Sequence, residues 1–418
     1  MKKSKKIIIW IISIFLVTTI LITIINKIDL PATKDYLKRK LDPKLFAILQ
    51  VFGNLERSSK RLNNDYNVNF LPSTQFINLD LKKVNLNNYF LNEDSAGYAQ
   101  HLKIKVKQVF YIEEYKNNII FLTSDGKLFY NDFNKIIEKK HLEIISNNLD
   151  LDTALDLLID EEYIYVSGVI VESNCAYLVV YKAKLSNLNE FNFNNIFKSD
   201  ECVTMIQSGR MAKYKDNSLL LATAADVLIK KNEMDDKPQN DNSIYGKILE
   251  LNLNTNDYKI FSKGHRNILG LYVDKNVILS TENGPRGGDE VNKIIFGENY
   301  GWPEVSYGQK YSNNEFYPNS HSEKNFKEPI YAFIPSVGIS QITKIGDNFS
   351  NKWKNNFLVA SLNGNHLYRM KFDKNFEKVF FIENIFIGER IRDLIYLKDK
   401  KVFLIAMESS GSLGILKP

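Results

Sequence analysis

The 418-residue sequence is short of the residues that mark fibrous, low-complexity or disulfide-rich proteins. It contains two cysteines, ten prolines and twenty glycines, and 44% of its residues are hydrophobic. The low glycine and proline content excludes a collagen-like or low-complexity chain, and the apolar content is enough for a packed core. Cys175 and Cys202 are too few for a disulfide framework and match no metal motif. They are either one disulfide of an exported protein or two buried thiols.

Most of the chain also lacks an excess of charge of either sign. The formal net charge is +6, but residues 1–61 contain 13 Lys and Arg against 4 Asp and Glu, a balance of +9. The remaining residues therefore carry −3. Nucleic-acid-binding proteins concentrate basic residues on the folded body, so the pattern argues against DNA or RNA as a partner.

The basic N-terminal region predicts a membrane anchor. Four lysines within residues 1–6 precede an uncharged apolar run from Ile7 to Ile25. A helix of this length spans roughly the ~30 Å hydrocarbon core of a lipid bilayer. We therefore expect a cytoplasmic tail (1–6) and a single transmembrane helix (7–25) in the inner, cytoplasmic membrane, with the C-terminal domain on its periplasmic or extracellular side. A cleaved signal peptide is the alternative, but no small-residue cleavage site follows Ile25.

Residues 26–64 connect this anchor to the rest of the chain. Pro31 lies near the start of the segment, and basic residues recur along it. Basic residues next to an anchor are typical of a segment that lies at the membrane surface, although they also occur as an ordinary solvated face. The segment is interpreted as a short stalk.

Residues 65–418 contain a repeated pattern in which two short apolar, β-prone runs are separated by a polar turn. No part of this region has an apolar stripe of helical period over twelve or more residues. The pattern predicts an all-β, six-bladed β-propeller, whereas two β-sandwich domains would need a linker near the middle of the chain. The six units lie at residues 117–130, 162–181, 217–251, 276–290, 356–370 and 401–416.

One loop has the composition of a calcium site. Residues 284–290 read GPRGGDE and follow an apolar run. The glycines and the proline expose backbone carbonyls beside two carboxylates, and such hard oxygen ligands suit Ca²⁺. The same composition also fits a tight glycine-rich turn whose acids are only solvated.

The order of several motifs resembles one enzyme family. GHRN at 264–267, ENGPRGGDE at 282–290 and NYGWP at 299–303 are closely similar to the soluble PQQ-dependent aldose and glucose dehydrogenases, the glucose/sorbosone dehydrogenase family. The resemblance implies a six-bladed propeller that uses PQQ and Ca²⁺ to oxidise a sugar or small alcohol, passing electrons to a respiratory acceptor. Further segments in the same order are QSGR at 207–210, NSIYGKIL at 242–249, PSVG at 335–338, SLNGNHL at 361–367 and RIRD at 390–393.

The resemblance also implies roles for individual residues. Gly284 and Pro285 would offer carbonyls to a catalytic calcium, and Glu290 with Tyr300 would serve a second, structural calcium. Arginine suits the PQQ carboxylates because its planar fork binds a carboxylate with two hydrogen bonds. Arg266 would in addition face the reacting edge of PQQ. The implied PQQ contacts are Arg266, Asn267, Asn363, Gly364, Asn365, Arg390 and Arg392.

The proton-transfer residues depart from the family pattern. The family has its general base, a histidine, at the position of Ile206, and isoleucine cannot accept a proton. The carboxylate that orients this histidine falls at Asp226, one residue out of register. We therefore expect an oxidoreductase, with a non-catalytic PQQ- or sugar-binding propeller as the alternative.

The N-terminal pattern makes a prediction about topology. Residues 65–418 should be exported and remain attached to the membrane, because the lysines precede the apolar run and no cleavage site follows it. Membrane fractionation and N-terminal sequencing of the mature protein test this. A soluble mature protein that begins beyond residue 26 contradicts it.

Overall fold

The computed structural model of the protein describes residues 76–86, 106–225, 236–275, 277–311 and 313–418. The predicted tail, anchor and stalk (1–64) and Asp226 lie outside these residues. Within the described ranges, no helix has both the length and the apolar character needed to cross a membrane.

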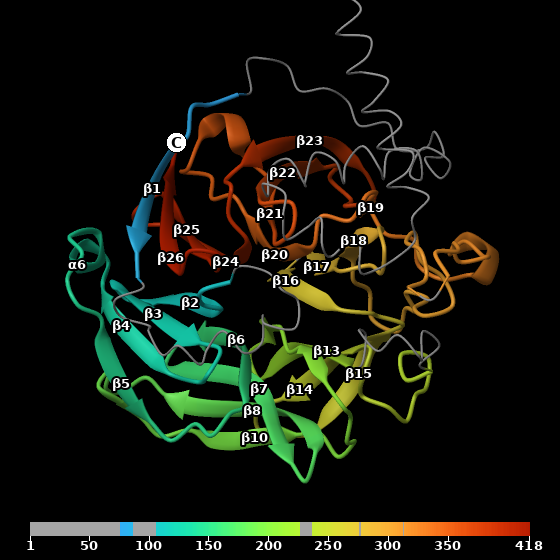
Figure 1. Ribbon diagram of the computed structural model, residues 1–418, viewed down its shortest axis with the longest axis horizontal. Helices are drawn as coiled ribbons and strands as arrows, with labels where there is room; N and C mark the ends of the chain where they lie inside the picture. The colour runs from blue at the N-terminus through green and yellow to red at the C-terminus, as the bar shows by residue number, and fades with distance from the viewer. Residues whose placement is uncertain (1–75, 87–105, 226–235, 276, 312) are drawn as a thin grey trace, which may run out of the picture. The chain divides into compact units, whose positions relative to one another are not determined.

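Six sheets of four or five strands surround a central axis, which confirms the six-bladed β-propeller (Figure 1). We number these sheets as blades 1 to 6, in the order in which the strand nearest the axis occurs along the chain. Blade 1 contains β2 (Phe110–Tyr115), β3 (Asn118–Thr123), β4 (Leu128–Asp132), β5 (Glu143–Asn147) and β9 (Glu190–Phe191). Blade 2 contains β6 (Thr153–Asp160), β7 (Tyr163–Glu172), β8 (Cys175–Lys184) and β10 (Asn194–Lys198). Blade 3 contains β11 (Ile206–Ser208), β12 (Met211–Lys215), β13 (Ser218–Ala225), β14 (Lys247–Asn252) and β15 (Tyr258–Lys263).

The second half of the ring has the same design. Blade 4 contains β16 (Ile268–Asp274), β17 (Val277–Glu282), β18 (Asp289–Lys293) and β19 (Tyr331–Phe333). Blade 5 contains β20 (Ile339–Lys344), β21 (Asn356–Ser361), β22 (His366–Phe372) and β23 (Val379–Phe386). Blade 6 contains β24 (Ile391–Leu397), β25 (Val402–Met407), β26 (Ser412–Lys417) and β1 (Asp80–Asn85). Short helices occur at α6 (Phe133–Ile137), η3 (Ser322–Lys324) and η4 (Asn351–Trp353).

The predicted apolar runs form the central strands of the blades. Strands β21 and β25 are buried along their whole length, because both of their faces pack against other parts of the ring. The apolar clusters accordingly run from blade to blade: one of them joins Phe110 of blade 1 to Leu404 of blade 6. Burial between neighbouring sheets therefore stabilises the ring.

The first described strand closes the ring. Strand β1 pairs antiparallel with β26, from Asp80 opposite Lys417 to Asn85 opposite Ser412. Blade 6 thus combines one strand from before blade 1 with three from the C-terminal end of the chain. This pairing covers an edge of β26 that would otherwise present unpaired backbone groups.

The two cysteines form a disulfide. Cys175, the first residue of β8, is bonded to Cys202, which follows β10 in the same blade. Next to it, Ala176 and Val203 form an isolated antiparallel bridge. Of the two interpretations of the cysteine pair, the structure contains the disulfide.

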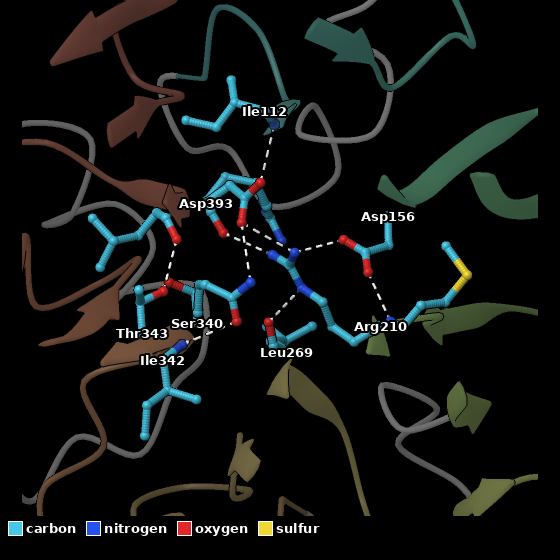
Figure 2. A network of polar contacts seen from close by, with 12 residues as sticks. Ile112, Asp156, Arg210, Leu269, Ser340, Ile342, Thr343 and Asp393 are labelled. Atoms are coloured by element: carbon cyan, nitrogen blue, oxygen red, sulfur yellow. Dashed lines mark hydrogen bonds and ion pairs between the residues drawn. The ribbon is translucent and has the colours of Figure 1, made fainter. Parts of the chain in front are cut away.

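A buried arginine connects the innermost strands at the axis (Figure 2). The guanidinium of Arg210, just before β12, donates from Nη1 to Asp156 Oδ1 on β6 at 2.6 Å and to Asp393 Oδ1 on β24 at 3.1 Å. Its Nε donates to the carbonyl of Leu269 on β16 at 2.8 Å, and its Nη2 donates to the carbonyl of Arg392 at 3.1 Å. One side chain therefore binds groups from three other blades.

The two aspartates extend this network to the remaining inner strands. Asp393 Oδ2 accepts from the backbone N–H of Ile112 on β2 at 3.0 Å, and its Oδ1 accepts from Gln341 Nε2 on β20 at 3.3 Å. Asp156 Oδ2 accepts from the N–H of Met211 at 2.7 Å. One set of hydrogen bonds thus contains groups on the innermost strand of every blade or next to it. These strands are β2, β6, β12, β16, β20 and β24. The network fixes the blades relative to one another at the axis.

Arg210 should be a major source of stability. Arg210→Met leaves Asp156 and Asp393 buried without their counter-charge, a change that typically costs about 3–5 kcal/mol. Denaturant unfolding measures the loss. The surface variant Lys215→Met is the control and should cost less than about 1 kcal/mol, because the Lys215 side chain is exposed, its contact with Glu250 is 3.8 Å long, and Glu250 also pairs with Lys259.

The same prediction has a pH dependence. Burial raises the pKa of Asp156 to about 7, against the lowering effect of Arg210. A carboxyl whose pKa is raised on folding contributes stability below its unfolded pKa, and that contribution is lost as the pH rises through about 7. Without Arg210, which lowers this pKa, the buried carboxyl of Asp156 stays protonated at pH 5, whereas at pH 8 ionising it without a counter-charge, or keeping it protonated, costs stability. The deficit of Arg210→Met should therefore be smaller at pH 5 than at pH 8. An equal deficit at both pH values would contradict this role.

Candidate functional site

Arg266 lies at the entrance to β16, where two loops pack against each other. Gly264 has a φ of +76°, and a Cβ at this position would lie 2.2 Å from Asn299 Oδ1. Only glycine permits this approach of the two backbones. The carbonyl of Gly264 accepts from the N–H of Trp302 at 2.9 Å. The guanidinium of Arg266 lies 5.3 Å from the centroid of the Trp302 ring, in a cation–π contact.

Two neighbouring residues hold the backbone of Arg266 in place. Glu282, at the end of β17, accepts from the backbone N–H of Arg266 and bonds His265 Nδ1 at 3.1 Å. The other ring nitrogen of His265 bonds Ser262 Oγ at 2.8 Å, and its ring stacks on Tyr300 at 4.6 Å. His265 is fully buried with both nitrogens in use, so it supports the loop and offers no free base.

Asp289 organises the GPRGGDE loop. Its carboxylate is buried and accepts from the N–H groups of Gly284 at 3.0 Å, Val337 at 2.9 Å and Gly338 at 2.5 Å. Ser336 Oγ and the N–H of Ile339 donate to it as well. These bonds attach the loop of blade 4 to the segment that enters blade 5. Asp289 is therefore a structural acceptor and not an available proton acceptor.

A second group of cationic side chains lies at the start of blade 6. Arg390 Nε donates to Glu408 Oε1 at 2.6 Å, and Arg392 Nε donates to Glu408 Oε2 at 2.8 Å. Arg390 Nη1 also donates to Asn363 Oδ1 at 2.5 Å. Although burial raises the pKa of Glu408, Arg392 and Arg390 hold that pKa below its ordinary value, so the carboxyl is ionised.

Hydrogen bonds connect the two groups of arginines. Arg266 Nη1 donates to the carbonyl of Asn283 at 2.6 Å, and Asn283 Nδ2 donates to the carbonyl of Ile339. The carbonyl of Val337, two residues before Ile339, accepts from the N–H of Asn363 at 3.0 Å. Asn363 in turn accepts from Arg390. The loops that hold Arg266, Asn363 and Arg390 therefore lie next to one another.

The remaining residues of the predicted PQQ set lie on the same loops. The Oδ1 atom of Asn267 is buried and has no hydrogen-bond partner. The N–H of Gly364 donates to the carbonyl of Val337 at 2.7 Å. Asn365 has a φ of +56° and closes the turn between β21 and β22.

Three of the four predicted metal ligands line a small pocket. This pocket is partly open to solvent and is lined by Gly284, Glu290 and Tyr300, and also by Arg266, Glu282 and Trp302 among others, but not by Pro285. Burial, followed by the charge of Glu282, raises the pKa of Glu290 well above its ordinary value. In the part of the chain that the structure describes, no group of three or more His, Cys, Asp or Glu is placed to hold a metal.

Tyr300 and Pro285 also have other contacts within the protein. The Tyr300 hydroxyl donates to the carbonyl of Lys293 at 2.5 Å and accepts from the N–H of Ile295 at 3.0 Å. The Tyr300 hydroxyl is therefore already hydrogen-bonded to two backbone groups. Pro285 packs near Gly308, where a Cβ would lie 2.8 Å from the proline Cγ.

Ile206 occupies an apolar environment. It is 4% exposed and belongs to a hydrophobic cluster of blades 2 and 3 that includes Leu155, Val203 and Met211. The next residue, Gln207, has both side-chain polar atoms buried without a hydrogen-bond partner. Ile206 is thus a hydrocarbon side chain within the core, and it has no group that could accept a proton.

Sequence reasoning did not identify Glu408, Asn283 or Glu282. Glu408 directly follows the fully apolar strand β25. A glutamate in such a place is rarely buried unless a cation pairs with it, so its position in the sequence could have indicated a buried ion pair. Asn283 and Glu282 were visible only as parts of a motif, and their bonds to Arg266 depend on the folded loops.

Comparison with known proteins identifies similar sequences. The Glucose / Sorbosone dehydrogenase family profile matches residues 151–415. The aldose sugar dehydrogenase YliI of Escherichia coli is 30% identical over 166 residues, which are 38% of this chain and 44% of that protein. Quinoprotein glucose dehydrogenase B of Acinetobacter calcoaceticus is 26% identical over 233 residues, 40% of this chain and 49% of that protein. These alignments span less than half the length of the curated relatives.

Solved structures share the fold. The soluble aldose sugar dehydrogenase of E. coli in its apo form superposes with a TM-score of 0.66 at 18% identity, covering 82% of this chain and all of that one. The PQQ-bound aldose sugar dehydrogenase of Streptomyces coelicolor gives a TM-score of 0.57 at 16% identity, covering 81% of this chain and 98% of that one.

Proposed function

Because the chain belongs to the glucose/sorbosone dehydrogenase family, we propose that its propeller binds PQQ through Arg266, Arg390 and Arg392. The observation that carries the proposal is the connected set of hydrogen bonds that brings these arginines to adjoining loops. PQQ has three carboxylates, and arginine forks are the natural partners of such a ligand. When bound, PQQ supplies a quinone that accepts a hydride.

The side chains present fit such a ligand. Arg390 and Arg392 carry two positive charges against the single negative charge of Glu408, which leaves a net charge of +1 beside Asn363. The buried Oδ1 atom of Asn267 lacks a partner in the protein, and a buried acceptor without a partner is costly unless a ligand or water supplies a donor. An anionic cofactor would compensate the net charge of the arginine pair, and an N–H or O–H group of the ligand would be needed to donate to Asn267 Oδ1.

We also propose that Ca²⁺ binds at the pocket of Gly284 and Glu290. Two buried carboxylates, Glu282 and Glu290, line this pocket, and burial followed by the charge of Glu282 raises the pKa of Glu290, so its ionised form is disfavoured unless a cation binds there. Carbonyl and carboxylate oxygens are the ligands that calcium prefers. Gly284, Pro285, Glu290 and Tyr300 would supply them, and a cation there would favour ionised Glu290.

The proposed reaction is the oxidation of an aldose or another small alcohol. The substrate hydroxyl must lose a proton as its hydride leaves, and Ile206 cannot accept it. We therefore propose slow turnover for the wild type. The second candidate function, a propeller that binds PQQ or a sugar without turnover, is favoured by one observation: Ile206 is packed in an apolar cluster.

The membrane anchor is part of the proposed function. A helix at residues 7–25 would hold the propeller near a respiratory electron acceptor in the same membrane. Its support is the charge and hydropathy pattern of the sequence.

Arg392 provides the test of PQQ binding. Arg392→Gln should weaken PQQ binding by about 10- to 100-fold, because a charge-assisted hydrogen bond to an anion contributes about 1.5–3 kcal/mol. Absorbance titration with PQQ, with calcium or with a chelator, measures the affinity. Lys215→Gln is the control for loss of a distant surface charge and should bind as the wild type does. Wild-type protein that binds no PQQ in the presence of calcium refutes the cofactor assignment.

Ile206 provides the test of turnover. Ile206→His should raise the rate of sugar-dependent dye reduction, because a positioned base typically contributes ~10²–10⁴-fold. The gain should be smaller than this, because the imidazole enters an apolar cluster and lacks an assured orienting carboxylate. Ile206→Leu is the control and should leave the rate unchanged. Wild-type turnover comparable with an ordinary dehydrogenase would mean that another residue is the base.

A further inference from the structure

We propose that Glu408 is a positioning residue that holds Arg390 and Arg392 together to receive an anionic ligand. This proposal deepens the proposed function and rests on it. It assigns a role to a residue that none of the sequence motifs contains.

The geometry is specific to two arginines. Glu408 is fully buried, and each of its two oxygens accepts from the Nε atom of a different arginine, at 2.6 Å and 2.8 Å. Both arginines are 8% exposed. They are two residues apart at the start of β24, where the strand register shifts between Ile391 and Asp393, and both side chains reach the same carboxylate. A single carboxylate with its two acceptor oxygens is sufficient to hold both.

The backbone around Glu408 makes the arrangement rigid. The N–H of Glu408 donates to the carbonyl of Arg390 at 2.9 Å, so backbone and side chain of these two residues are bonded to each other. The N–H of Arg390 donates to Ser409 Oγ at 3.2 Å. On its other side, Arg390 Nη1 reaches Asn363 on the neighbouring blade. Because each arginine uses its Nε atom for Glu408, the direction of its guanidinium plane is fixed by that bond.

Glu408 has two opposite effects on an anion. It reduces the positive charge of the pair from +2 to +1, which by itself weakens anion binding. It also fixes the orientation of two flexible side chains, which lowers the entropy cost of binding. We propose that the effect on orientation is larger than the effect on charge. Removing Glu408 should therefore weaken PQQ binding and not strengthen it.

The test compares three proteins by PQQ absorbance titration of the full-length chain in detergent. Glu408→Gln removes the negative charge and places an N–H₂ donor against one arginine Nε–H. Glu408→Asp keeps the charge but withdraws the carboxylate by one carbon, so it cannot reach both arginines equally. Both variants should bind PQQ about tenfold more weakly or worse, since each releases at least one arginine from its fixed orientation and ligand binding must then order that side chain.

A matched control comes from another buried arginine. In blade 5 the Nε atom of Arg369, which is 0% exposed, donates to Glu383 at 2.5 Å, and this pair takes no part in the site. Glu383→Gln should lower the melting temperature and leave the PQQ affinity within about twofold of the wild type. This separates a loss of stability from a loss of positioning.

Each outcome decides the role of Glu408. Wild-type affinity in both Glu408 variants, with only a lower melting temperature, would overturn the proposal and leave Glu408 a structural residue. Tighter PQQ binding by Glu408→Gln would overturn it in favour of a charge-neutralising role. If Glu408→Gln shows no cooperative unfolding, Glu408→Asp decides between the same results. Wild-type protein that binds no PQQ overturns the proposed function, and this proposal with it.

Discussion

The buried ion pairs of Arg210 with Asp156 and Asp393 are the interaction on which the rest of the structure depends. A propeller has no continuous sheet across its axis, so the blades are fixed there by side chains. In this protein one guanidinium and two carboxylates bond groups on or next to all six innermost strands. Removing one partner would leave buried charge without compensation, which is far more costly than losing an exposed pair.

The candidate site is built on this axis. Arg392 lies between the network and the site: its carbonyl accepts from Arg210, and its side chain bonds Glu408. The carbonyl of Leu269, which also accepts from Arg210, is three residues after Arg266. The positions of Arg266 and Arg392 are thus both tied to Arg210 through short stretches of backbone. A change at the axis would be transmitted to the arginines that the proposed cofactor needs.

The sequence predicted the fold better than the site. Six pairs of apolar runs predicted six blades, because a strand buried between neighbouring sheets needs apolar residues on both faces. The closure of the ring by β1 was not predictable, since the segment Asp80–Asn85 is polar and becomes a strand only by pairing with β26. Motif resemblance identified Arg266, Arg390 and Arg392. It could not show that Glu408 joins the last two, because that contact depends on side-chain geometry between two strands.

We propose that one end of this propeller is a cationic site for PQQ and that Ile206 stands where the resemblance puts the proton acceptor. The most direct measurement is a crystal structure of the protein grown with PQQ and calcium. We expect PQQ carboxylates within hydrogen-bond distance of Arg266, Arg390 and Arg392, with Glu408 still bound to the last two. PQQ bound elsewhere, or absent from these arginines at saturating concentration, would contradict the account.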